Sequence, residues 1–367
     1  MAARILITAD AVGGVWQYAT DLACALAPLG FAPTVAVLGP EPNAAQRAPV
    51  EAAGIPILET GLPLDWLCDG PVPVREAGEA LAKLVREQGF DLVHCNMPTL
   101  AASGAFGVPV VAVAHGCLAT WWDAANGTKL PPDYRWQRTL TEQGFRAASR
   151  VVAPTAAFAA VIQRTYGLTD LPLAVHNGRR PLVEGEGAPT DCVFTAGRLW
   201  DQVKQTRLLD RVAARLPVPF HAAGALVGPH GEQVPADHLQ PLGLLSEAEL
   251  AEWLVQRPIF VSAARFEPFG LAVLEAAAAG CPLVLADLPT FRELWDGAAV
   301  FVAPEDEDGF VAAIETLRAD PARHAALGEA AQSRAARYTP AAVARDMAAL
   351  YRALLDPAAT LTRSAAA

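Results

Sequence analysis

The order of short apolar runs and longer amphipathic stretches constrains the fold of this chain most strongly. Runs typical of buried β-strands alternate with stretches of helical spacing along the whole chain. This alternation is typical of parallel sheets covered by helices. The strand runs form two series, at 4–9, 33–39, 55–58, 91–96, 109–114 and 150–154, and then at 191–197, 218–224, 258–263, 282–287 and 298–304. We therefore expect an α/β protein with two doubly wound domains.

A segment without periodicity separates the two series. NGRRPLVEGEGAPT, residues 177–190, is rich in glycine, proline and charge, which is typical of a linker. The sequence thus predicts an N-terminal domain at 1–176 and a C-terminal domain at 191–339. The stretch 340–356 starts with proline and is amphipathic, so we expect a last helix that packs on either domain, including the N-terminal one. Opposed doubly wound domains bind ligands in a shared cleft, at the carboxyl ends of their strands.

Composition excludes several classes of protein. Of the 367 residues, 53% are hydrophobic and 18% are charged, and no apolar stretch reaches the ~20 residues that span a bilayer. The opening MAARILITAD lacks the features of a secretory signal, so we expect a cytoplasmic protein without stable membrane insertion. A net charge of −11 without a basic cluster argues against nucleic-acid partners. The six cysteines form no CxxC pair, and the histidines lack metal-ligand spacing.

The stretch EPFGLAVLE, residues 267–275, joins a strand run to an alanine-rich helix. Glu267 lies in the connecting loop, and Glu275 lies about one and a half turns into the helix. Gly270 permits a close turn, after which the first amides of the helix form a site for an anion such as phosphate. A carboxylate at Glu275 can accept both hydroxyls of a ribose. Both glutamates are equally consistent with solvated charges at the ends of a helix.

A second stretch, AGRLWDQVKQ at 196–205, offers two cations near the start of a helix. The strand ends at Gly197, and Arg198 and Lys204 follow. Arginine binds a diphosphate through a bidentate fork, and lysine binds it as a point charge. The alternative interpretation is an exposed lysine and an arginine that pairs with Asp201.

Together, the two motifs resemble those of the family 4 glycosyltransferases, a retaining family whose two-domain fold is called GT-B. In that family a GRL…K motif and an E-x7-E motif bind the sugar nucleotide. The resemblance covers most of the chain, including the loop DAVGG, the HNG tripeptide at 176–178 and the last helix. It implies that Arg198 and Lys204 hold the diphosphate, that Glu275 holds the ribose, and that Glu267 lies near the donor sugar. The donor-binding residues that it implies are Gly13, Gly14, Gly197, Arg198, Lys204, Glu267, Phe269, Gly270, Leu271 and Glu275.

Two further features of the N-terminal half have counterparts in the family. Gly13 and Gly14 lack the GxGxxG spacing of a nicotinamide site. The resemblance places their loop near donor phosphate or acceptor, although a simple tight turn explains them as well. His115 ends a strand run at a position that faces the donor sugar in the family, commonly as His-Asp, whereas Gly116 follows it here. A strand-end histidine is also often structural. The catalytic residues implied are Glu267, His115, Arg198 and Lys204.

An aromatic segment, CLATWWDAANGTKLPPDYRWQ at 117–137, is the candidate acceptor region. We expect it to form a loop or a broken helix. Aromatic faces on such a loop suit stacking against a sugar or an apolar acceptor, and they equally suit anchoring the loop to the core. The side chains concerned are Trp121, Trp122, Tyr134 and Trp136.

The sequence EDED at 305–308 has the DxD spacing with which other glycosyltransferases hold a divalent cation. Asp306 and Asp308 follow Pro304 and precede a helical stretch, so they are better explained as acidic residues at a helix start. Since Arg198, Lys204 and a helix N-terminus are available for the leaving diphosphate, we expect neither a metal nor another cofactor.

The sequence therefore predicts a hexosyltransferase of class EC 2.4. It would move a sugar from a nucleoside-diphosphate sugar, most commonly a UDP-sugar in the resembling family, to an acceptor hydroxyl with retention at the anomeric carbon. Two other functions fit the same fold. One is a sugar-nucleotide epimerase, and the other is a nucleotide-sugar-binding module without turnover.

Overall fold

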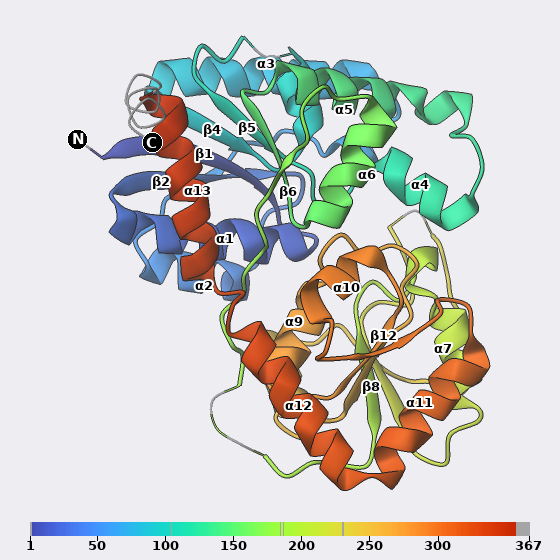
Figure 1. Ribbon diagram of the computed structural model, residues 1–367. Helices are drawn as coiled ribbons and strands as arrows, with labels where there is room; N and C mark the ends of the chain where they lie inside the picture. Colours follow the sequence, from blue (N-terminus) through green and yellow to red (C-terminus); the bar gives the residue numbers. More distant parts are fainter. Residues whose placement is uncertain (1, 104, 184, 186, 230, 357–367) are drawn as a thin grey trace. The chain divides into compact units, whose positions relative to one another are not determined.

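The computed structural model describes residues 2–356 except 104, 184, 186 and 230. These residues divide into two compact units (Figure 1). The first unit comprises the residues up to Asp123, those from Thr128 to Gly178 and those from Thr339 onward. The second unit comprises Ala124–Gly127 and the residues from Arg179 to Tyr338. The main chain thus enters the second unit after Gly178 and leaves it before Thr339.

Within its described residues, the first unit contains a seven-stranded parallel sheet in the order β3-β2-β1-β4-β5-β6-β7. The strands are β1 Ala3–Asp10, β2 Phe31–Leu38, β3 Ile57–Glu59, β4 Leu92–Cys95, β5 Val110–Val113, β6 Arg150–Ala153 and β7 Leu173–Ala174. The strand order reverses between β1 and β4. Ligands of open α/β sheets bind at such a switch point, beyond the carboxyl ends of the strands.

Helices cover both faces of this sheet, which explains why the central strands are apolar on both sides. Ile5 and Ile7 of β1 pack with α1 Gly14–Leu26 and α13 Pro340–Leu355, which lie side by side in Figure 1. Leu6 points to the opposite face, where it packs with α3 Pro71–Gln88. The remaining helical elements are α2 Ala44–Ala52, α4 Leu118–Asn126, α5 Arg135–Ala147, α6 Ala156–Tyr166 and the 3₁₀ turns η1 Ala27–Leu29, η2 Asp65–Leu67, η3 Pro98–Ser103 and η4 Pro132–Tyr134.

The second unit has the same kind of sheet, with six parallel strands among its described residues in the order β10-β9-β8-β11-β12-β13. The strands are β8 Val193–Ala196, β9 Phe220–Ala223, β10 Gln240–Gly243, β11 Ile259–Ser262, β12 Leu283–Ala286 and β13 Val300–Val302. Here the order reverses between β8 and β11. The loops after these two strands carry both charged motifs of the sequence.

Two groups of helices cover the second sheet. Phe194 and Phe260 face α8 Glu247–Leu254, α9 Leu271–Ala278, α10 Pro289–Trp295 and α12 Pro321–Ala335. Val193 and Val261 face α7 Thr206–Ala213 and α11 Glu307–Ala319 on the other side (Figure 1). A 3₁₀ turn, η5 Gln202–Lys204, precedes α7.

The predicted α/β architecture with two doubly wound sheets is confirmed. Each predicted strand run contains a strand, but the sequence did not predict β7 and β10. Both are edge strands: β7 has two exposed residues, and β10 has the sequence QPLG with one half-buried side chain. β7 has only two residues, and β10 contains a proline and a glycine, which are depleted in strands. Within the described part of the chain, no helix has both the length and the apolar character needed to cross a membrane.

Candidate functional site

The loop after β8 holds Arg198 against a buried carboxylate. The Asp201 side chain is 2% exposed, accepts the N–H of Val203 at 3.3 Å and pairs with the Arg198 guanidinium at 3.0 Å. Arg198 itself is 57% exposed, and its guanidinium lies 5.7 Å from the centre of the Trp200 ring. Arg198 therefore makes the ion pair that one interpretation of the sequence gave it, and it remains accessible to a ligand.

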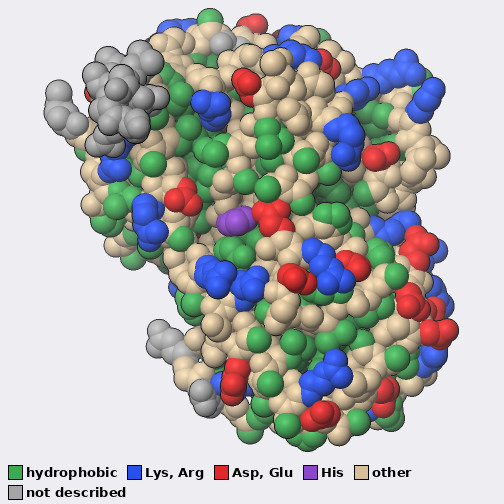
Figure 2. All heavy atoms as spheres, in the orientation of Figure 1, with side chains coloured by type: hydrophobic (Ala, Val, Ile, Leu, Met, Phe, Trp, Pro, Cys, Tyr) green, Lys and Arg blue, Asp and Glu red, His purple; other side chains and the backbone are tan. Residues whose placement is uncertain are grey.

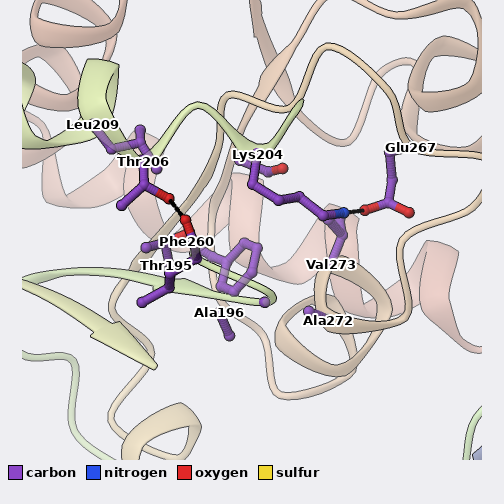
Figure 3. Close-up of a pocket in the computed structure, with 12 residues that line it drawn as sticks. Thr195, Ala196, Lys204, Thr206, Leu209, Phe260, Glu267, Ala272 and Val273 are labelled. Carbon is purple, nitrogen blue, oxygen red and sulfur yellow. Dashed lines mark hydrogen bonds and ion pairs between the residues drawn. The ribbon is translucent and has the colours of Figure 1, made fainter. Parts of the chain in front are cut away.

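Lys204 and Glu267 come from different loops and point toward each other (Figure 3). The Lys204 Nζ lies 2.5 Å from the Glu267 Oε2, and each side chain is 19% exposed. The two loops are tied together because the Arg265 N–H donates to the Val203 carbonyl at 2.8 Å. Lys204 is thus neither an isolated nor a fully exposed cation. The strand order explains the contact, since β8 and β11 are neighbours and both loops leave their carboxyl ends.

The N-terminus of α9 adjoins this ion pair. Gly270 precedes the helix with φ +90° and ψ 72°, and Leu271 is its first residue. The first amides of a helix have no intrahelical acceptor and carry a partial positive charge. Phe269 is buried, so it anchors the loop in the core. A small cavity is lined by Gly197, Lys204, Thr206, Glu267, Ala272 and Val273, among others (Figure 3).

Gly270→Ala is expected to lower the free energy of unfolding by about 1–3 kcal/mol, because a non-glycine residue is strained at this φ. The added Cβ would also lie 3.1 Å from the Phe291 Cε1 and 3.2 Å from the Glu267 Cγ. Denaturant unfolding measures the loss. Gly54→Ala shares the strain, since Gly54 has φ +71°, but has open space around its Cβ position, so it should lose less stability than Gly270→Ala. A Gly270→Ala protein as stable as the wild type would contradict the strain at this turn.

Glu275 lies on α9 and is held by a buried arginine. Its Oε1 accepts a hydrogen bond from the Arg179 Nε at 2.9 Å, and the two side chains are 11% and 3% exposed. The same guanidinium also pairs with Glu247, the first residue of α8, and Arg180 pairs with Glu247 as well. Arg179 was not among the residues predicted for the site, because the sequence places it in the apparent linker. An arginine directly after HNG carries no spacing signal of its own.

The glycine loop of the first unit, DAVGG at 10–14, is held by hydrogen bonds to the Asp10 side chain. The Asp10 Oδ1 accepts the N–H of Val12 at 3.0 Å and that of Gly13 at 3.2 Å. Gly13 is the N-cap of α1, and Gly14 is the first residue of that helix. The Gly13 amide, which the resemblance assigned to a ligand, therefore already has an acceptor. The Gly14 amide lies in the first turn, where a helix offers no acceptor of its own.

His115 follows β5 and belongs to a hydrogen-bonded network of the first unit. Its Nε2 lies 2.8 Å from the Asn96 Oδ1, which is also 3.0 Å from the His94 Nε2. The His94 Nδ1 lies 2.6 Å from the Tyr351 hydroxyl of α13. Asn96 is fixed in turn, because its side-chain amide donates to the Thr8 carbonyl at 2.7 Å. Since the Asn96 oxygen is only an acceptor, both histidines donate to it through Nε2.

Burial keeps both histidines neutral. Loss of solvation lowers the pKa of His94 to about 4. It lowers the pKa of His115 to about 3, with a smaller contribution from His94. At pH 7 each ring therefore has one donor and one acceptor nitrogen. For His115 the donor is Nε2, so Nδ1 is the acceptor.

The free energy of unfolding is expected to fall as the pH decreases from about 6.5 toward 4. In the unfolded chain His94 has an ordinary pKa of about 6.5, whereas in the folded protein it stays neutral down to about 4. Below pH 6.5 the unfolded state thus binds a proton that the folded state does not. Each such histidine contributes a slope of about 1.4 kcal/mol per pH unit. Denaturant unfolding of the wild type and of His94→Gln at several pH values measures how steeply the free energy of unfolding changes with pH. The slope of the variant should be smaller by the contribution of one proton, about 1.4 kcal/mol per pH unit. Equal slopes would contradict a neutral His94.

The aromatic segment forms a broken helix, as predicted. Trp121 and Trp122 lie on α4, Tyr134 ends η4, and Trp136 lies at the start of α5. The ring centres of Trp122 and Tyr134 are 5.8 Å apart, and those of Trp121 and Trp122 are 6.3 Å apart. The tryptophans are half-buried, and Tyr134 is 44% exposed. The cluster therefore anchors part of the segment and leaves one aromatic face accessible.

Asp306 and Asp308 of the DxD-like stretch lie at the start of a helix. The Asp306 Oδ1 accepts the N–H of Gly309 at 2.9 Å at the N-terminus of α11, and Asp308 pairs with Arg215 at 2.7 Å. Among the residues that the structure describes, no group of three or more His, Cys, Asp or Glu side chains is arranged to hold a metal ion. On the face drawn in Figure 2, acidic and basic side chains are interspersed.

Both halves of the chain match known glycosyltransferase families. The family model described as Glycosyltransferase Family 4 matches residues 12–179. A second family model, described as Glycosyl transferases group 1, matches residues 190–320. D-inositol 3-phosphate glycosyltransferase 1 of Catenulispora acidiphila is 28% identical over 358 residues, which cover 80% of this chain and 84% of that protein. D-inositol 3-phosphate glycosyltransferase 2 of the same organism is 27% identical over 393 residues, 94% of this chain and 90% of that protein.

Solved structures show the same fold. Sucrose-phosphate synthase of Thermosynechococcus elongatus superposes with a TM-score of 0.79 at 18% identity, over 97% of this chain and all of that one. Anabaena HepE in complex with UDP-glucose superposes with a TM-score of 0.74 at 20% identity, over 96% of this chain and 100% of that chain. The two doubly wound units and the matching descriptions define a glycosyltransferase of class EC 2.4. The chain belongs to the family 4 glycosyltransferases, has their GT-B fold, and transfers a sugar from a nucleotide-sugar donor.

Proposed function

We propose that this glycosyltransferase moves a hexosyl group from a UDP-sugar to an acceptor hydroxyl, with retention at the anomeric carbon and without a metal ion. The observation that carries the proposal is the Lys204–Glu267 ion pair beside the N-terminus of α9. A cation and a set of unpaired helix amides in one cavity suit a diphosphate. The neighbouring Glu275 suits the ribose of the same nucleotide.

The proposed chemistry is mainly electrostatic. As the bond between the sugar and the diphosphate breaks, negative charge grows on the leaving phosphate. Lys204, Arg198 and the amides after Gly270 stabilise that charge more strongly in the transition state than in the ground state. These groups supply the positive charge that a divalent cation provides in metal-dependent transferases, which supports independence of metal.

Retention is proposed through a displacement on one face of the sugar. The leaving phosphate oxygen accepts the proton of the acceptor hydroxyl, so no protein group has to act as nucleophile or general base. Glu267 stands close to the sugar and to the phosphate. His115 is neutral because its pKa is lowered well below the working pH, and its Nδ1 can accept a hydrogen bond from a sugar hydroxyl.

The donor and acceptor proposals draw on the related proteins. UDP is favoured because a protein of the same fold, Anabaena HepE, has been crystallised with UDP-glucose. The two Catenulispora relatives are named for D-inositol 3-phosphate, so that compound is the first acceptor to test. The aromatic segment with Trp121, Trp122, Tyr134 and Trp136 is proposed as the acceptor region, where Tyr134 offers an accessible ring for stacking.

The proposal is tested by measuring product formation. The protein is incubated with UDP-glucose, UDP-N-acetylglucosamine, GDP-mannose or ADP-glucose, and with D-inositol 3-phosphate, myo-inositol or methyl glucoside. Release of the nucleoside diphosphate is followed with and without EDTA, and NMR gives the configuration of the product. We expect an α-linked product from an α-linked UDP-sugar, at the same rate in EDTA. An inverted product or loss of activity in EDTA would contradict the mechanism. Conversion of the donor to an epimer without acceptor would indicate an epimerase, and binding without turnover would indicate a binding module.

A further inference from the structure

Arg179 is a charged side chain placed almost entirely inside the second unit. Its side chain is 3% exposed, although the residue follows the HNG tripeptide in a stretch that the sequence presents as a linker. Burying a guanidinium costs several kcal/mol unless acceptors surround it. Arg179 meets this requirement with two carboxylates, Glu275 on α9 and Glu247 at the start of α8. The arginine therefore joins two helices through one side chain.

The backbone of Arg179 is fixed as well. Its N–H donates to the carbonyl of Tyr338 at 3.1 Å, so the first and the last residue of the long segment of the second unit lie side by side. The preceding residue packs closely against the backbone of Thr339, because a Cβ at Gly178 would lie 2.3 Å from the Thr339 carbonyl oxygen. The Arg179 backbone is therefore held by a hydrogen bond, next to a residue where only glycine fits.

The contact with Glu275 is specific in geometry. The Arg179 Nε donates to Oε1 at 2.9 Å, while the terminal nitrogen of the same planar group is directed at Glu247. Two contacts in a fixed fork determine where the guanidinium lies, and the guanidinium then determines where the Glu275 oxygens lie. A carboxylate has about four lone-pair sites, so one that accepts from an arginine can accept from ligand hydroxyls as well.

We propose that Arg179 is a positioning residue that orients the Glu275 carboxylate to accept the 2′- and 3′-hydroxyls of the donor's ribose. This inference rests on the proposed function, because it takes Glu275 to be the ribose-binding group. Arg179 does not touch the nucleotide itself. It acts through Glu275 by holding that carboxylate in one rotamer.

The alternative is that Arg179 only neutralises two buried carboxylates. The two roles predict a different dependence of nucleotide affinity on the ribose hydroxyls, which a binding experiment can measure. A purely structural arginine affects every nucleotide equally, because it acts on the folding of the unit. A positioning arginine affects a nucleotide only to the extent that the nucleotide has ribose hydroxyls.

The test is calorimetric titration of the full-length protein with UDP and with 2′,3′-dideoxyuridine diphosphate. In the wild type, UDP should bind about 10- to 100-fold more tightly than the dideoxy form, because a hydroxyl–carboxylate hydrogen bond is charge-assisted. Glu275→Ala should reduce this ratio to near one by lowering UDP affinity alone. Arg179→Gln should do the same, although Glu275 is still present. Arg179→Lys keeps the charge but loses the fork, and it should lie between Arg179→Gln and the wild type.

Arg180→Gln is the matched control. Arg180 is the adjacent residue, shares the partner Glu247 and is 49% exposed, so this variant should keep the wild-type ratio. Circular dichroism and thermal unfolding of each variant report on the fold. If Arg179→Gln does not fold, Arg179→Lys tests the proposal through its ratio of UDP affinity to dideoxyuridine diphosphate affinity.

Three results separate failure of this inference from failure of the proposed function. If the wild type binds UDP with a ribose-dependent ratio that Glu275→Ala removes, but both Arg179 variants keep the ratio, Arg179 is not a positioning residue. The same conclusion follows if the Arg179 variants weaken UDP and its dideoxy form equally. If the wild type binds neither UDP nor GDP, ADP or dTDP, the proposed nucleotide site itself is wrong.

Discussion

Replacing Lys204 with methionine is expected to lower kcat/KM for sugar transfer by about 100- to 1,000-fold, the range found when one group that stabilises developing charge is removed. The Lys204 ammonium lies in the cavity beside the N-terminus of α9, 2.5 Å from the Glu267 carboxylate. Methionine keeps the unbranched side chain as far as Cε and removes the charged Nζ. The diphosphate then loses a cation at the moment when its negative charge increases. Steady-state assay of nucleoside-diphosphate release measures the loss.

The control for this variant is Lys83→Met. Lys83 lies on α3, is 69% exposed and forms an exposed ion pair with Glu87 at 3.7 Å. Its removal should change kcat/KM by less than twofold, since exposed pairs contribute little. A Lys204→Met protein with the wild-type kcat/KM would show that the GRL…K motif does not hold the diphosphate.

Replacing Glu267 with glutamine is expected to reduce kcat to below about one thousandth of the wild-type value while the fold is retained. Glutamine has the same shape but no charge, so the Lys204 ammonium loses the partner that fixes its position. In the proposed mechanism the carboxylate also lies where positive charge develops on the sugar, and a neutral amide would stabilise that charge far less. The hydrogen bond that the Thr290 hydroxyl donates to the Glu267 backbone carbonyl, 2.7 Å long, is unaffected by the change. The loop should therefore keep its shape.

Single-turnover kinetics and thermal unfolding check this prediction together. Glu87→Gln is the matched control, because Glu87 is the exposed partner of Lys83. The double variant Lys204→Met/Glu267→Gln should lose little more than the more severe single variant, since the two side chains act as a unit. Wild-type kcat in Glu267→Gln would remove Glu267 from the mechanism.

The architecture could be predicted from the sequence because it depends on local patterns. Buried parallel strands are apolar throughout, and the helices between them have amphipathic spacing, so two doubly wound domains follow from the order of the runs. The edge strands β7 and β10 could not be predicted in this way, since β7 has only two residues and β10 contains a proline and a glycine. Their pairing depends on neighbours that are distant in the sequence.

The site was predictable as two motifs but not as contacts. Arg198, Lys204, Glu267 and Glu275 were identified from motif spacing, and their assigned roles remain predictions. The Lys204–Glu267 pair joins residues 63 positions apart, and only the adjacency of β8 and β11 explains it. Arg179 was missed because its partners, Glu247 and Glu275, are 68 and 96 positions away.

The network at His115 was also invisible in the sequence. Asn96 follows a buried strand, and its neighbour His94 reaches Tyr351 across 257 positions. No spacing rule relates a strand near the start of the chain to the last helix. The contact arises because α13 packs on the same sheet face as α1.

Calorimetric titration with UDP, GDP, ADP and dTDP, each with and without EDTA, tests most directly whether the second unit holds a nucleotide donor. One nucleotide, predicted to be UDP, should bind with an affinity that EDTA does not change and that Glu275→Ala markedly weakens. Absence of binding by all four nucleotides, or binding that Glu275→Ala leaves unchanged, would contradict the site formed by Lys204, Glu267, Glu275 and the N-terminus of α9.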